Sequence, residues 1–208
     1  MMCAVGSPTK TLTYESTANY NVAENPHTFS AQGIGAASSD RRVIVGFSWF
    51  GAQTLSSATI GGVSAAITVQ GATASGGGAI IIATVPTGTT ADIVLTMSGA
   101  VARWGITVWS AVGMSTNTAT DTGSSSADPG TDTLVSVAGG FLICAAGSQH
   151  IAGAGSVSWA NATERTDVDI DANLLFSGAD AATAGGNVSP SADYTPSITT
   201  AMAVFATW

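Results

Sequence analysis

The sequence predicts an all-β protein, an antiparallel β-sandwich of jelly-roll-like type with about 12–14 short strands and almost no helix. Three observations predict this fold class. Short runs rich in Val, Ile, Thr and aromatic residues alternate with Gly, Pro and Asn turn signals. No window of about eleven residues carries apolar side chains with the helical period. Ala, Gly, Ser and Thr supply 113 of the 208 residues, a composition unlike that of helical bundles and coiled coils.

The first half of the chain carries the clearest strand signals. The β-branched and aromatic run at 42–50 is typical of a central strand. Gly61-Gly62 predicts a hairpin between 57–60 and 63–69, and Pro86-Thr87-Gly88 predicts a turn before a returning strand. Strands are expected, in order, at 9–14, 28–34, 42–50, 57–60, 63–69, 79–85, 91–97 and 104–112.

The second half begins with a stretch, 116–132, that is rich in Ser, Thr, Asp and Gly and is expected to be a long irregular loop or arm. A hairpin is expected between 134–137 and 140–146. The remaining strands are expected at 156–159, 165–170, 174–178 and 199–208.

Length and charge limit the domain count and the partners. A chain of 208 residues is expected to form one sandwich domain, 1–208, with residues 1–24 as an extended arm. Five basic and 13 acidic residues disfavour nucleic-acid binding, which needs clustered cations. The sequence has no basic start followed by an apolar core, so no signal peptide is expected. It also has no run of 18 apolar residues, so no membrane-spanning helix is expected. Cys3 and Cys144 are not expected to form a disulfide framework.

The strongest candidate for a metal site is the run Asp167, Asp169 and Asp171. Strand alternation places these three carboxylates on one face, where they could offer oxygen ligands to Ca²⁺. The spacing does not match an EF-hand loop. The competing interpretation is a solvent-facing edge strand whose charges prevent edge-to-edge pairing, and no metal or other cofactor is predicted.

Aromatic residues offer a second candidate site. Trp49, Phe50 and Trp208 could form a contact surface for a partner. The alternative is that they fill the core, because Ala and Gly cannot do so. Catalysis is not expected: His27 and His150 lie in no nucleophile motif, and no Gly-x-Ser-x-Gly elbow is present.

Several strand and turn segments resemble a group of small β-rich proteins from the virion structural modules of tailed phages and prophages. The likeness spans roughly residues 28–208. The segments that carry it are SDRRVIVG at 39–46, ATIGGVSAA at 58–66, VPTGTTADIV at 85–94, RWGI at 103–106 and SGAD at 177–180. The resemblance implies a component of the virus particle, made in the host cytoplasm, without specifying which component.

Two functions are therefore expected to compete. The first is a noncatalytic capsid decoration (cement) protein that binds the major capsid protein as a homo-oligomer, expected to be a homotrimer, and stabilises contacts between capsomers. The second is a tail-fibre or spike component that binds a glycan of the host surface. An extended fibre repeat would favour the second function, and the sequence contains none.

Overall fold

The computed structural model describes residues 10–149, 155–196, 198 and 200–208. It confirms the all-β, antiparallel fold class: these residues contain 17 strands and no helix. The first half of the chain forms β1 (Thr11–Tyr20), β2 (His27–Gly33), β3 (Arg42–Trp49), β4 (Leu55–Ile60), β5 (Val63–Ser64), β6 (Ala66–Ala72), β7 (Gly77–Thr84), β8 (Thr90–Met97) and β9 (Trp104–Val112). The second half forms β10 (Asp121–Ser125), β11 (Gly130–Thr131), β12 (Leu134–Gln149), β13 (Ser156–Ala160), β14 (Thr163–Ile170), β15 (Leu174–Val188), β16 (Ser191–Thr195) and β17 (Ala201–Thr207).

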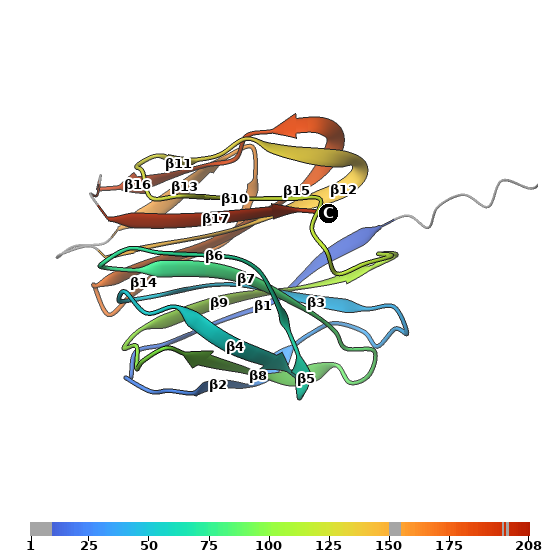
Figure 1. Ribbon diagram of the computed structural model, residues 1–208, viewed down its shortest axis with the longest axis horizontal. Helices are drawn as coiled ribbons and strands as arrows, with labels where there is room; N and C mark the ends of the chain where they lie inside the picture. The colour runs from blue at the N-terminus through green and yellow to red at the C-terminus, as the bar shows by residue number, and fades with distance from the viewer. Residues whose placement is uncertain (1–9, 150–154, 197, 199) are drawn as a thin grey trace, which may run out of the picture.

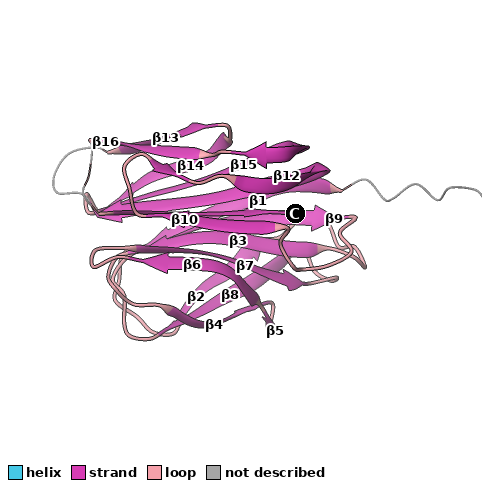
Figure 2. Cartoon of the chain, turned by 45° about the horizontal axis from the view of Figure 1, so that its top comes forward, coloured by secondary structure: helices cyan, strands magenta, loops and turns pink. Residues whose placement is uncertain are grey.

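Four sheets stack as layers (Figures 1 and 2). The first outer sheet has the strand order β2-β8-β4-β5 and covers the first inner sheet, β1-β9-β3-β7-β6. The second inner sheet, β10-β17-β12-β15-β14, lies against the first inner sheet. The second outer sheet, β11-β16-β13, completes the stack.

The two halves of the chain share one topology. In both inner sheets, the first strand of the half lies next to its last strand. The third strand follows, and then come the two strands of a later hairpin. Both outer sheets pair the second strand with the penultimate strand and then with the fourth strand. Strands β5 and β6 of the first half together correspond to β14 of the second. Each half therefore has the strand order of a jelly roll, with two sheets of antiparallel strands.

The inner sheets pack with approximate twofold symmetry. Strand β1 contacts β14, and its counterpart β10 contacts β6; likewise β9 contacts β15 while β17 contacts β7. Strands β3 and β12 contact each other near the centre. This reciprocal pattern is that of an isologous dimer, here built from two halves of one chain.

Alternation along the strands of the inner sheets supplies two core layers at once. In β3, Val43, Val45 and Phe47 face the first outer sheet, whereas Ile44 faces the second inner sheet. A strand buried on both faces carries apolar residues at successive positions, which explains the apolar run at 43–45 and the small buried residues Gly46 and Ser48 that follow it. Strand β9 likewise contributes to both layers, with Ile106 and Val108 on one face and Trp109 on the other.

Small residues let the inner sheets approach closely. A Cβ atom at Gly105 would lie 2.2 Å from the ring of Phe176 on the opposite sheet. On the other side of the approximate twofold axis, Gly78 lies against Val204 and Met202. Large side chains thus fill the space that glycines leave, and the large residue belongs to the second half of the chain in both places.

Three expectations differ from the structure. Segments 134–137 and 140–146 form the single strand β12 rather than a hairpin, because Gly139 adopts φ 71° and makes a β-bulge instead of a turn. The stretch 116–132, expected to be irregular, contains β10 and β11. Residues 11–20 of the expected arm pair with β9 as the edge strand β1, while residues 1–9 lie outside the described residues.

Candidate functional site

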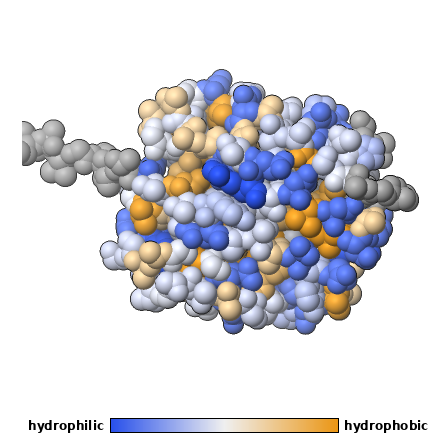
Figure 3. All heavy atoms as spheres, turned by 180° about the vertical axis from the view of Figure 1, so that it is seen from behind, coloured by the Kyte–Doolittle hydropathy of each residue, from blue (hydrophilic) through white to orange (hydrophobic). Residues whose placement is uncertain are grey.

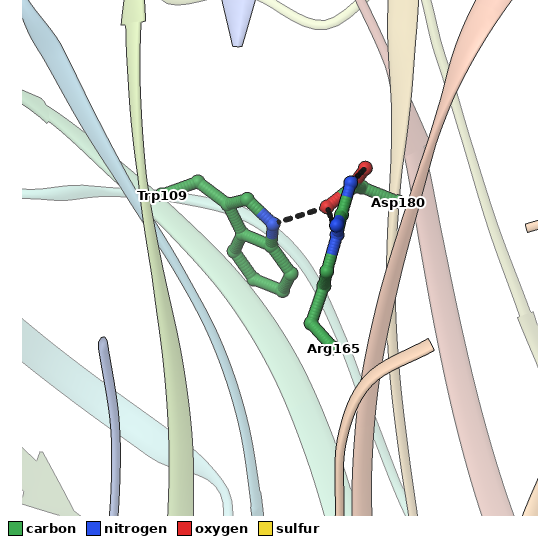
Figure 4. Close-up of polar contacts among 3 residues, drawn as sticks. All are labelled: Trp109, Arg165 and Asp180. Atoms are coloured by element: carbon green, nitrogen blue, oxygen red, sulfur yellow. Dashed lines mark hydrogen bonds and ion pairs between the residues drawn. The ribbon is translucent and has the colours of Figure 1, made fainter. Parts of the chain in front are cut away.

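The most distinctive polar cluster lies between the two inner sheets, where three elements bring together Trp109, Arg165 and Asp180 (Figure 4). The Asp180 carboxylate, on β15, accepts hydrogen bonds from Trp109 Nε1 at 2.7 Å and from Arg165 Nε at 2.7 Å and Nη2 at 2.9 Å. The side chain of Asp180 is 8% exposed and that of Arg165 is 38% exposed. The hydrogen bond to Asp180 is the main reason that the pKa of Arg165 is raised.

A β-bulge places Arg165 in this cluster. The register of β14 against β15 shifts between Glu164 and Thr166, so Arg165 is the extra residue. Next to the ion pair is a cavity of about 240 Å³. It is lined by Arg165 and Asp180 together with Lys10, Leu12, Phe141 and Ala182.

The three aspartates proposed from the sequence do not converge. Asp167 is partly buried, and the Val157 amide donates to both of its oxygens at 3.2 Å. Burial is the main cause of its raised pKa. Asp171 follows the end of β14 with φ 55° and forms an ion pair with Arg103 at 3.1 Å. Within the described residues, no group of three His, Cys, Asp or Glu side chains, and so not Asp167, Asp169 and Asp171, could hold a metal ion.

Two of the three aromatic residues proposed as a contact surface are buried instead. Trp49 is fully buried and donates from Nε1 to the Gln53 carbonyl at 2.8 Å. Trp208 is 2% exposed and lies beside Phe141. These large rings fill cores that small residues cannot fill, so they do not form an exposed surface.

Phe50, the third of these residues, is partly exposed. The Arg103 guanidinium lies 5.3 Å from the centre of its ring, which is a cation–π distance. Because Arg103 also pairs with Asp171, it connects Phe50 and Asp171, which were expected in different candidate sites.

Arg41 lies in no sequence motif that indicates a site, and its side chain is fully buried. It donates to four backbone carbonyls: those of Val85, Gly35, Gly88 and Thr87. Burial lowers the pKa of this guanidinium. Arg41 thus joins two loops at one end of the first sandwich, a structural role that no local sequence signal distinguishes from a surface charge.

His27 and Cys144 are also buried. His27 Nδ1 lies 2.8 Å from Glu24 Oε2, and its ring stacks between Tyr20 and Trp104. Cys144 is a free thiol whose pKa is raised well above its usual value by burial. His150 and Cys3 lie outside the described residues.

Comparisons with protein-family models, with curated proteins and with solved structures gave no match. No helix that could cross a bilayer occurs among the residues that the structure describes.

Proposed function

We propose that this protein is a noncatalytic structural component of a tailed-phage particle, a decoration protein that binds the major capsid protein on the outer shell as a homotrimer. The observation that carries the proposal is the pair of jelly rolls packed through their inner sheets into one four-layered block. Jelly rolls are recurrent in viral capsid proteins. This support is an analogy at the level of the fold, and the sequence resemblance to virion modules points the same way.

The outer surfaces suit contact with a large protein assembly. The second outer sheet presents Ser156, Ser158 and Thr195 at exposed or partly exposed positions, and the first presents Ser57 and Thr90. Hydroxyl groups form hydrogen bonds without the desolvation cost of charges. The face in Figure 3 intersperses hydrophilic, neutral and hydrophobic residues.

Two measurements test this proposal. Antibody labelling of intact particles, seen by electron microscopy, is expected to decorate the capsid shell. Light scattering during size-exclusion chromatography is expected to give a mass three times the 20.5 kDa of one chain. Label found only on tails would contradict the capsid assignment, and a monomer at all concentrations would contradict the trimer.

A second candidate function is glycan binding by a tail fibre or spike. The cavity beside Asp180 favours this function, because it is lined both by charged side chains that can form hydrogen bonds with sugar hydroxyls and by the aromatic ring of Phe141. Labelling of tail structures would support this candidate over the decoration role.

A further inference from the structure

The approximate twofold symmetry identifies which residues of the two halves correspond. Both hairpins at the inner-sheet edges contain a bulge with one extra residue. Thr68 is the extra residue opposite Ile80 and Ile81, and Arg165 is the extra residue opposite Gly178 and Ala179. Across the inner sheets, Gly46 lies against Ala145. Both observations give the same correspondence, in which Gly46 matches Ala145 and Thr68 matches Arg165.

With this register, the polar cluster has an uncharged counterpart in the same molecule. Ile143 of β12 pairs with Asp180 and Ala206. Its counterpart Ile44 pairs with Ile82 and Trp109. Asp180 therefore corresponds to Ile82, and Trp109 corresponds to Ala206.

The first half shows that the fold does not need the ion pair. Ile82 and Thr68 occupy the places of Asp180 and Arg165 and allow the same packing of inner sheets. Burying the Asp180 carboxylate carries a desolvation penalty, and an ion pair that offsets such a penalty is often no more stabilising than apolar residues of similar size. The Arg165–Asp180 pair thus requires an explanation beyond fold stability.

The adjoining cavities differ in the same way. The cavity beside Thr68 has a volume of about 290 Å³ and is lined by Ala66, Ile67, Thr68, Asn117, Thr118 and other uncharged residues. Tyr14 of β1 pairs with Trp109 and Thr122 of β10 pairs with Ala206, so these two residues occupy matching positions. Lys10 and Thr118 each lie four residues before them and therefore correspond as well. Lysine and arginine in one cavity thus replace threonines in the other.

We propose that the cavity beside Asp180 binds a small ligand that carries a carboxylate, no larger than one acidic sugar residue. The cavity contains Lys10 and Arg165, two of only five cationic side chains in a chain of net charge −8. Asp180 holds Arg165 through Nε and Nη2, so Nη1 is the part of the guanidinium group that donates to the ligand carboxylate.

The other walls fit the remainder of such a ligand. Asp180 Oδ2 already accepts from both Trp109 Nε1 and Arg165 Nε, whereas Oδ1 accepts from Arg165 Nη2 and has a lone pair left to accept from a ligand hydroxyl. Phe141, Leu12 and Ala182 offer an apolar wall for the C–H face of a sugar ring. The volume of about 240 Å³ is below the range of drug-sized sites, which limits the ligand to about one sugar ring. This inference holds whether the protein lies on the capsid or on the tail.

The test is an NMR titration of the full chain with D-glucuronate, with D-glucose as the uncharged control. Glucuronate is expected to shift amide signals around Lys10, Phe141 and Arg165, and glucose is not. Lys10→Thr, which copies the other cavity, is expected to weaken binding about tenfold, the effect of losing one charge-assisted hydrogen bond. Thr118→Ala in the uncharged cavity is the matched control and is expected to leave the affinity unchanged.

A second variant, Arg165→Thr with Asp180→Ile, also copies the first half and is expected to abolish binding. Lys10→Thr keeps the test valid if this double variant does not fold, because Lys10 forms no part of the ion pair. The proposal is overturned if wild type shows no shifts with glucuronate, if glucose produces the same shifts, or if Lys10→Thr binds as tightly as wild type.

Discussion

Removing one partner of the Arg165–Asp180 ion pair is expected to have unequal effects on stability. Asp180 is 8% exposed and Arg165 is 38% exposed. Arg165→Met strands a buried carboxylate, whereas Asp180→Asn leaves a cation that can turn toward water and retains an oxygen to accept from Trp109 Nε1. Loss of one partner of a fully buried pair costs about 3–5 kcal/mol.

The exposure of Arg165 reduces these figures. We expect Arg165→Met to lower the free energy of unfolding by about 3 kcal/mol, at the low end of that range. Asp180→Asn is expected to lower it by about 1 kcal/mol, the usual effect of weakening a hydrogen bond. The double variant that combines Arg165→Met with Asp180→Asn is expected to be more stable than Arg165→Met alone, because it no longer buries an unpaired charge.

Urea denaturation measures all three variants, and an unchanged slope against urea concentration would show that the folded and unfolded states remain comparable. If Asp180→Asn costs as much as Arg165→Met, or if the double variant is the least stable of the three, the burial argument is refuted. Circular dichroism of each variant provides the control for folding.

Three further predictions concern single residues. Arg41→Met leaves the carbonyls that Arg41 joins without their donor and is expected to cost at least about 3 kcal/mol in urea denaturation; a loss below 1 kcal/mol would be incompatible with this role. Gly105→Ala drives a methyl group into Phe176 and is expected to cost about 1–3 kcal/mol; an unchanged melting temperature would show that the inner sheets separate easily. Asp167 has a raised pKa when folded, so its charge costs stability as the pH rises past its usual value of 3.8. Asp167→Asn is therefore expected to melt higher than wild type at pH 7 and to lose that advantage below about pH 4; a lower melting temperature at pH 7 would contradict the assigned sign.

The sequence predicted the fold class and most strands because those signals are local. The β-branched and aromatic residues at 42–50 predicted β3 because that strand is buried on both faces, and Gly61-Gly62 adopts positive φ at the expected turn. The hairpin expected between 134–137 and 140–146 is wrong because the Gly-Gly pair between these segments is compatible with a bulge as well as with a turn.

The repeated topology was not predictable from the sequence. Several corresponding positions carry unlike residues, such as Ile82 and Asp180 or Trp109 and Ala206, and such differences weaken any repeat signal in the sequence. The polar cluster was missed for a related reason. Trp109 and Asp180 are 71 positions apart, and only the stacking of the two inner sheets brings them together.

The proposed role as a capsid decoration protein is tested most directly by counting copies in purified particles, using quantitative mass spectrometry against the major capsid protein. A decoration protein is expected in a number close to one copy per capsid subunit, or a simple fraction of it. A few copies per particle would move the protein to the tail, and absence from particles would contradict a virion role altogether.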